Sequence, residues 1–499
     1  MIFDSNRLDA NHFANRRFDV CIAGAGVAGI VAARRLAAEG LRIALLEAGD
    51  REYSAASQDF YSGDVVGHEY FDLAATRLRF LGGTSNHWGG MCRPLDAVDF
   101  EAKEYAEWSG WPIRRSDLDP YLSDAASILD IDTRFDGDVI SLQSPSDNLM
   151  PITFQYSRPT RLREKYADEL EESETIEVYL NLALVDILLT EMGGAVENFA
   201  CRRGNVGEEA QILIEADFFV LAMGGLEVPR LLLNCNQQIQ AGIGNQEDLV
   251  GRFFMEHPHF TLGHLLSRDP RRPAFLAFAS GKERLRSLMC RSDLMHSIGN
   301  LISGNQITCT SLQFWAPTAK FMKEKEILNC GLIVSADFDS NAIYSGELRA
   351  LFEQMPNPNS RVMLADTRDP YGLRRIALDW QLSEIDKRTA LECAIEVGKT
   401  IANLDTGRLR LVDWLISEDG SFPGLDEDAV GGNHHMGTTR MASNPERGVV
   451  DPDCRVFGTD NLFVAGSSVF PTSGHAHPTV TIAQLTLRVS DHIARLVNN

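Results

Sequence analysis

Residues 18–50, FDVCIAGAGVAGIVAARRLAAEGLRIALLEAGD, decide how the chain begins to fold. A short apolar strand leads into three glycines in GxGxxG register, an alanine-rich helix and a second strand that ends at Glu47; the glycines are Gly24, Gly26 and Gly29. The first permits a tight turn, the second lets the backbone approach a pyrophosphate, and the third lets helix pack on strand. The helix N-terminus offers free N–H groups and a positive dipole end. This order predicts a dinucleotide site in which Glu47 accepts hydrogen bonds from a ribose diol.

The unit alone leaves open whether the dinucleotide is FAD or a nicotinamide, although an acid at Glu47 argues against the 2′-phosphate of NADP. The alternative is a glycine-rich turn that binds no ligand. A second glycine-rich stretch, FLGGTSNHWGGMCR at 80–93, is too irregular for core packing and predicts another close approach to a ligand. Its candidate contacts are Gly82, Gly83, Asn86 and His87.

Composition limits the partners and the compartment. Of 499 residues 44% are hydrophobic and 8% aromatic, and 47 Lys plus Arg against 70 Asp plus Glu give a formal net charge of -23. This excess disfavours nucleic acid and anionic membranes. Nine scattered cysteines without a CxxC pair fit a reducing, cytoplasmic location. We expect no membrane span and no secretory signal, with twin-arginine export through Arg16 and Arg17 as a minor alternative.

The middle of the chain suggests the domain order. Apolar segments at 176–189 and 212–233, the second ending its strand at Gly224 with a helix starting near Pro229, should complete the dinucleotide sheet. Alternating strands and an amphipathic helix (382–404) predict an antiparallel sheet that roofs a substrate cavity. His257 and His259 are interpreted as structural rather than catalytic. The predicted segments are 1–98 and 159–260 for cofactor binding, 99–158 as a lid or insertion, 261–405 for substrate, and 406–499 as a return to the cofactor and catalytic site.

The C-terminal block carries the remaining candidates. The segment NLFVAG predicts a strand that leads into a turn at Gly466 and Ser467. Pro478 is well placed as the first residue of a helix from Thr479 to about Val497. His477 then lies at the positive end of that helix.

Together with GGNHHMGTTRM (431–441) and HAHPT (475–479), these motifs resemble the glucose-methanol-choline (GMC) family of flavin oxidoreductases over about 200 residues. The GGTSNHW register is closest to the branch with pyranose oxidase and membrane sugar dehydrogenases. The resemblance implies an α/β fold, with a Rossmann-like FAD-binding domain of the glutathione-reductase type and an α+β substrate domain. It also implies a backbone contact of Val185 with adenine, and at His87 either a covalent histidyl–FAD link or a hydrogen bond without attachment.

The resemblance further implies that His434 is the general base and His477 its hydrogen-bonding partner, although the order of these roles stays open because many relatives have Asn before the closing Pro. Imidazole suits removal of a hydroxyl proton near neutral pH. His435 should point away, and His475 is the second choice. A metal at His475 and His477 is the weaker reading, because no acid or cysteine nearby completes a ligand set. We therefore expect no metal.

The predicted activity is FAD-dependent oxidation of an alcohol, a secondary or hemiacetal hydroxyl of a sugar or glycoside, with hydride transfer to flavin N5. O2 or an external electron acceptor would reoxidise the enzyme, and a homo-oligomer stays open. The alternatives are a sterol or terpenoid alcohol oxidase, a non-redox lyase on the flavin scaffold, and a flavin-binding subunit without turnover.

Overall fold

The computed structural model describes residues 1–498 except 10, 15, 136–145, 205–210, 268–310, 338–343, 419 and 429. The predicted substrate-binding segment 261–405 therefore lies partly outside the described residues. No helix among the described residues combines the length and the apolar character that crossing a membrane requires. The α-helices of this part of the chain are α1 (Val27–Ala38), α2 (Ala55–Gln58), α3 (Leu122–Leu129), α4 (Leu162–Lys165), α5 (Ala167–Glu172), α6 (Gly224–Asn234), α8 (Ala319–Lys325), α9 (Glu384–Asn403), α10 (Asp413–Ile416) and α11 (Thr479–Val497).

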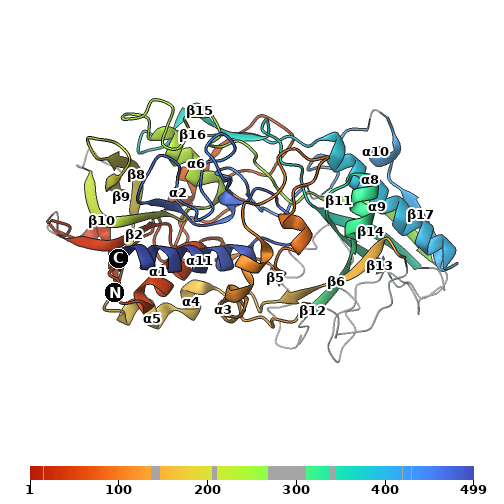
Figure 1. Cartoon of the computed structure of the whole chain (residues 1–499), viewed down its shortest axis with the longest axis horizontal. Coiled ribbons are helices and arrows are strands. Elements are labelled where there is room, and N and C mark those ends of the chain that lie inside the picture. Colours follow the sequence, from red (N-terminus) through yellow and green to blue (C-terminus); the bar gives the residue numbers. More distant parts are fainter. Residues whose placement is uncertain are drawn as a thin grey trace.

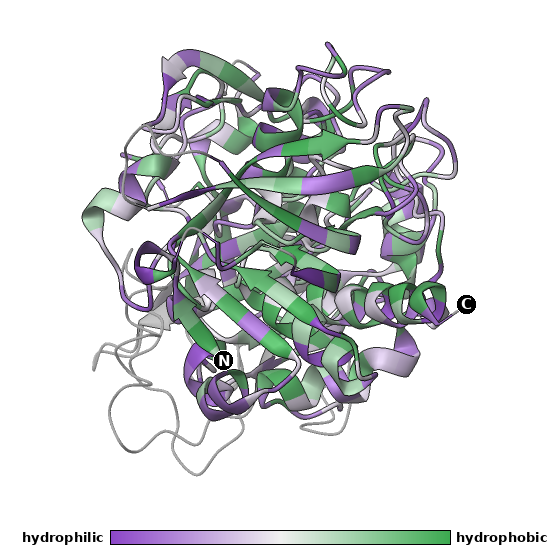
Figure 2. Cartoon of the chain, turned by 90° about the vertical axis from the view of Figure 1, so that its left-hand side faces the viewer, coloured by the Kyte–Doolittle hydropathy of each residue, from purple (hydrophilic) through white to green (hydrophobic). Residues whose placement is uncertain are grey.

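An eight-stranded sheet forms the half of the molecule that holds both termini (Figure 1). Its strands, in pairing order, are β1 (Ile2–Asp4), β7 (Ile176–Leu180), β3 (Ile43–Leu46), β2 (Arg17–Ala23), β10 (Ile212–Leu221), β9 (Val196–Arg203) and β8 (Leu182–Leu189), with β18 (Leu462–Val464) beside β10. The pairs from β1 to β10 and the pair β10–β18 are parallel, whereas β8, β9 and β10 pair antiparallel. The central strands are buried, and in Figure 2 they carry mostly hydrophobic residues.

Helices α1 and α11 pack against each other on one side of this sheet, so the first and last helices of the chain are neighbours (Figure 1). The α1 interior is apolar and small, with Ile30, Val31 and Ala33 buried. This confirms the predicted strand–helix–strand unit, and α11 begins and ends where the sequence predicts. The fold is the mixed α/β architecture that we expected.

A seven-stranded antiparallel sheet forms the other half. Its strands, in pairing order, are β17 (Gly407–Leu411), β11 (His259–Ser267), β14 (Tyr344–Phe352), β13 (Cys330–Asp337), β12 (Ser311–Pro317), β6 (Leu149–Tyr156) and β5 (Met91–Cys92). Helix α9 packs on it, as the amphipathic pattern predicts. A third sheet joins β15 (Arg361–Arg368), β16 (Arg374–Asp379) and β4 (Gly63–Val65).

Two local expectations need correction. The segment 176–189 is not one strand, because Asn181 adopts a left-handed φ of 56° and the chain turns from β7 into β8. Helix α6 starts at Gly224 rather than near Pro229. Pro229 is tolerated inside it because the Gly225 carbonyl, which a residue at 229 would otherwise engage, accepts a hydrogen bond from Thr438 Oγ at 2.6 Å.

The sheets also cross the predicted segment boundaries. Strand β6 of the predicted lid pairs with β12 in the antiparallel sheet, so part of segment 99–158 builds the substrate half. Strands β15 and β16 from the predicted substrate segment pack instead on α6 of the dinucleotide half. These placements depend on long-range strand pairing, which local patterns do not specify.

Candidate active site

A cavity of about 330 Å³ lies at the carboxyl ends of the parallel strands, where open α/β sheets bind ligands. Most of the predicted site residues line it: Gly24, Gly26, Glu47, Gly83, His87, Gly224, Gly466, Ser467, Pro478, Thr479, His434 and His477. The lining therefore joins the first motif of the chain to the last. Four predicted cofactor contacts, Gly29, Gly82, Asn86 and Val185, are not among the lining residues.

The first two glycines of the opening motif keep the dinucleotide end of the cavity clear. Gly24 has a φ of 101°, and a Cβ there would lie 2.7 Å from the Ala222 carbonyl oxygen. Gly26 caps α1 without a side-chain hydrogen bond, so the helix N-terminus faces the cavity with unsatisfied amides. Helix α11 begins beside the same cavity, at Pro478 and Thr479. Two helix N-termini on one cavity suit a ligand with more than one anionic group.

Glu47 lies at the expected position after β3. Its side chain is 6% exposed, and its two oxygens accept hydrogen bonds from the Ala25 N–H (3.1 Å) and the Gly49 N–H (2.8 Å). A carboxylate has about four acceptor sites, so after a third backbone hydrogen bond from Ala48 one stays available for a donor such as a ribose hydroxyl. Burial raises the pKa of Glu47, and its backbone donors oppose that shift. These groups fit the ribose end of FAD.

The predicted residues outside the lining support the cavity indirectly. A Cβ at Gly29 would lie 1.8 Å from the Gly24 carbonyl oxygen, so this glycine allows α1 to approach the turn. Gly82 has a φ of 90°, and the Asn86 side chain donates to the carbonyls of Leu81 and Gly83 at 2.9 Å. Val185 packs with Phe60, Ala183 and Tyr371. Its neighbours 182–184 line the cavity in its place.

The two histidines of GGNHHMGTTRM point to different places. The His435 ring bonds to the Tyr70 hydroxyl at 3.1 Å, and burial lowers its pKa to about 3. The His434 ring instead packs 4.6 Å, centroid to centroid, from the ring of His477. A Cβ at Gly432 would lie 2.7 Å from His434 Cε1, which explains why a glycine precedes this pair.

A short backbone bridge brings a third histidine to His434. Met255 and Met436 exchange two backbone hydrogen bonds of 3.0 Å, which align the segments 255–259 and 434–436. His257 Nδ1 then lies 2.9 Å from His434 Nδ1, and His257 Nε2 lies 2.9 Å from the Gly474 carbonyl oxygen. A carbonyl only accepts, so His257 carries its proton on Nε2 and accepts at Nδ1. His434 must therefore donate from Nδ1, which leaves the lone pair of His434 Nε2 free.

The Glu256 side chain links the two segments that carry His257 and His434. Glu256 Oε1 accepts from the backbone N–H groups of His257 and His434 at 2.8 Å each, and Oε2 accepts from the Tyr70 hydroxyl at 2.5 Å. The carboxylate is fully buried and lies 4.0 Å from His434 Nδ1. Burial raises the pKa of Glu256 to about 7, against the effect of its donors. The charge of this carboxylate can therefore change near neutral pH.

The histidines at the site are held neutral. Burial lowers the pKa of His434 well below its ordinary value of 6.5, with neighbouring imidazoles adding to the effect. Burial also lowers the pKa of His257 to about 4 and that of His477 to about 3. A backbone hydrogen bond between His477 and Met91 opposes this shift, so the ring donates to the Met91 carbonyl. His477 Nε2 is buried and has no hydrogen-bond partner, which leaves it an acceptor.

Two residues interpreted as structural thus lie at the site. His257 bonds to His434, and the His259 ring lies 6.2 Å from that of His434 and 6.4 Å from that of His477. His475, the second choice for a functional role, is fully buried with its Nε2 3.9 Å from Asp96. The EHPH sequence at 256–259 contains the missed residues. Their place beside His434 depends on the backbone bridge to Met436, which no local sequence pattern predicts.

The cavity thus combines a dinucleotide turn, two helix N-termini and unprotonated imidazoles, which define an oxidoreductase that uses a bound dinucleotide. The family model described as GMC oxidoreductase matches residues 356–486, and that of an NAD(P)-binding Rossmann-like domain matches residues 22–93. The chain therefore resembles GMC oxidoreductases in its C-terminal part, and it is an FAD-dependent oxidoreductase that acts on alcohol or sugar-like substrates.

Individual relatives agree over the whole length. The chain is 23% identical to the fructose dehydrogenase large subunit of Gluconobacter japonicus, covering 95% of this chain and 97% of the relative. It is 24% identical to the 6'''-hydroxyparomomycin C oxidase of Streptomyces lividus, over 96% and 92%. An FAD-dependent oxidoreductase from Chaetomium thermophilum shares the fold, with a TM-score of 0.63 at 14% identity, over 96% of this chain and 99% of that one.

Proposed function

We propose that the enzyme oxidises a secondary or hemiacetal hydroxyl of a sugar or glycoside, with His434 as general base and His477 as its partner. One observation carries this proposal: His434 Nδ1 is committed to His257, so its unprotonated Nε2 is available in a residue that lines the cavity. A base must offer a lone pair to the proton that it removes. When bound, FAD supplies the acceptor for the hydride that leaves the carbinol carbon.

Glu256 favours His434 over His477 as the base. Taking up a proton makes His434 a cation, and an ionised Glu256 oxygen 4.0 Å away stabilises that charge. Burial and neighbouring imidazoles lower the pKa of both rings, so the nearby carboxylate is the feature that singles out His434. His434 therefore takes the proton, and its new Nε2–H donates back to the substrate oxygen.

The His477 acceptor supports a polyol substrate. With its N–H committed to Met91, His477 can accept from a second hydroxyl but cannot donate to the first. A sugar presents adjacent hydroxyls that can donate to both rings at once. A sterol or long-chain alcohol has one hydroxyl and would leave an acceptor unused. The two relatives matched over more than nine-tenths of this chain are named for fructose and hydroxyparomomycin, which agrees with a carbohydrate.

His87 is the proposed point of covalent attachment for the flavin. Its side chain is exposed within the cavity lining, directly after the turn that Gly82 and Asn86 support. Denaturing the protein and separating it from free flavin tests this proposal. Yellow colour should stay with the wild-type chain and leave the His87→Ala chain. If the yellow colour separates from both the wild-type and the His87→Ala chains, His87 contacts the flavin without a covalent bond.

The test of the substrate class is anaerobic bleaching of the flavin colour. Ketoses, aldoses and glycosides are compared with a long-chain alcohol and a sterol. We expect at least one carbohydrate to bleach the enzyme and neither apolar alcohol to do so. Bleaching by the sterol alone would replace the proposal with a sterol oxidase, and no bleaching by any alcohol would favour a non-redox use of the scaffold. The final acceptor, O2 or an external carrier, stays a prediction.

A further inference from the structure

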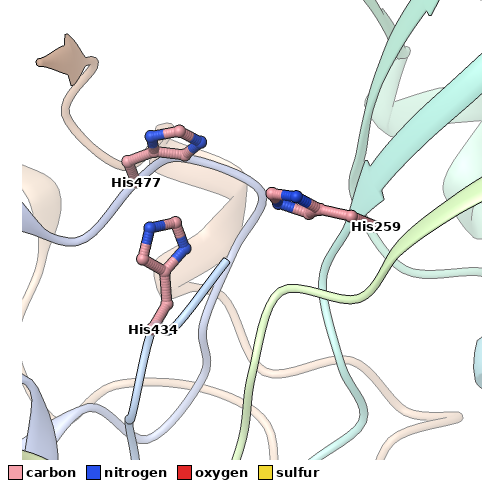
Figure 3. Close-up of side chains that lie close together, drawn as sticks. All are labelled: His259, His434 and His477. Atoms are coloured by element: carbon pink, nitrogen blue, oxygen red, sulfur yellow. The ribbon is translucent and has the colours of Figure 1, made fainter. Parts of the chain in front are cut away.

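Three imidazoles from separate parts of the chain face one small space (Figure 3). His259 opens strand β11, His434 lies in the loop before Gly437, and His477 lies before helix α11. One ring nitrogen of each lies within 4.8 Å of the other two. Sequence reasoning found no third ligand for a metal beside the C-terminal histidines, and His259 supplies one from the antiparallel sheet.

Two of these three histidines have a ring nitrogen without a partner. His259 Nε2 and His477 Nε2 are both buried without a hydrogen bond. Buried polar atoms are nearly always paired, so two unpaired nitrogens side by side indicate a missing ligand. In the described residues, the other group of this kind joins Asp96, Asp99 and His475, but Arg93 and Asn329 already bond to its two carboxylates.

We propose that His259, His434 and His477 form a binding site for a divalent transition-metal ion, best matched by Zn²⁺. Three imidazoles with an open fourth position are a ligand set that zinc accepts. Zinc–nitrogen bonds of about 2.0–2.1 Å require the ring nitrogens, which lie within 4.8 Å of one another, to approach to about 3.3 Å. Neutral imidazoles do not attract Mg²⁺ or Ca²⁺, which prefer oxygen ligands.

The surroundings compensate the charge of such an ion. The fully buried Glu256 carboxylate lies 4.0 Å from His434 Nδ1 and accepts the backbone N–H of that residue. A ligating histidine usually donates its other ring N–H to an outer acceptor, and for His434 Nδ1 that acceptor is His257. Because His434 and His477 are also the proposed base and partner, the ion and the substrate hydroxyl would exclude each other. This consequence rests on the proposed function, whereas the metal site does not.

The test is direct binding of Zn²⁺ to chelator-treated holoenzyme by isothermal titration calorimetry. We expect one ion per chain. Losing an outer support costs a metal site about 10–100-fold in affinity, so His259→Ala, which removes a ligand, should weaken binding by at least about tenfold. His264→Ala is the matched control, because His264 lies on the same strand with an exposed side chain. It should leave the buried site unchanged.

Cobalt gives a second measurement that does not depend on one variant folding well. Co²⁺ bound by three imidazoles in a tetrahedral site should show visible d–d bands beyond the flavin absorption, and Zn²⁺ should abolish them. The proposal is overturned if the wild type binds no Zn²⁺, or if His259→Ala and a His259→Gln variant bind it as tightly as the wild type. Metal that binds with the expected ligand dependence but leaves anaerobic bleaching unaffected would instead contradict the proposed roles of His434 and His477.

Discussion

The two large sheets differ in how their structure is encoded. In the eight-stranded sheet, β2, α1 and β3 follow one another within residues 17–46, and Gly29 is required by a contact within the same motif. In the seven-stranded sheet, neighbouring strands come from distant segments, such as β6 beside β12 and β11 beside β17. We assign the first sheet to the cofactor and the second to the substrate. The strand–helix–strand unit of the first sheet is therefore encoded locally, whereas these pairs of the second sheet depend on long-range contacts.

The largest effect on folding and flavin content is expected from a substitution of Gly29 in the dinucleotide-binding motif. An alanine Cβ would lie 1.8 Å from the Gly24 carbonyl oxygen, so Gly29→Ala must push α1 off the turn. We expect a chain that is purified without flavin, or that does not fold. Gly40→Ala is the control, since its Cβ would meet nothing within 4 Å and only its φ of 83° costs about 1–2 kcal/mol. A full flavin content in Gly29→Ala, measured as the ratio of flavin to protein, would refute the packing argument.

The same contrast explains what sequence could predict of this molecule. Gly24, Glu47 and the helix from Thr479 were predicted because strand, turn and cap signals lie within a few residues of each other. The proximity of His257 and His259 to His434 was not predicted, because it depends on the bridge between Met255 and Met436. The break at Asn181 and the early start of α6 were missed because a left-handed residue and the Thr438 hydroxyl determine them.

A smaller effect is expected at the ribose end. Glu47→Gln keeps the shape of the side chain but replaces one acceptor oxygen with a donor that faces a backbone N–H. Hydrogen bonds to a charged group contribute about 1.5–3 kcal/mol, so FAD affinity should fall by about 10–100-fold. Titration of the apoprotein measures it, in a His87→Ala background that prevents attachment. The exposed Glu39→Gln variant should bind FAD like its parent. If the Glu47→Gln and Glu39→Gln variants bind FAD with equal affinity, Glu47 does not contact the cofactor.

His257 offers a test of long-range positioning. His257→Leu removes the acceptor that fixes the proton of His434 on Nδ1, and we expect a loss of about 10–100-fold in bleaching rate, below the full contribution of a base. His257→Asn places its side-chain oxygen near the former Nδ1 and should restore most of that loss. If the two variants are equally slow, His257 contributes packing alone.

The smallest effect concerns pH. The pKa of Glu256 is raised to about 7, so the carboxylate becomes anionic as pH rises through that value and then assists His434. The pKa of His434 lies well below 6.5, so His434 itself is already unprotonated there. We expect kcat/KM to increase about tenfold across pH 7 in the wild type, since one pKa unit of added basicity is worth about 1.4 kcal/mol. The increase should vanish in Glu256→Gln. If it persists, the titrating group is another one.

The most direct test of the account is the anaerobic bleaching rate of the His434→Ala holoenzyme with a carbohydrate that bleaches the wild type. We expect the variant to keep its flavin, because none of the cofactor-end contacts involve this side chain, and to bleach about 10²–10⁴-fold more slowly. The His264→Ala control should bleach at the wild-type rate. A His434→Ala enzyme that holds its flavin and bleaches as fast as the control would contradict the claim that the two ends of the chain meet to place this base at the flavin.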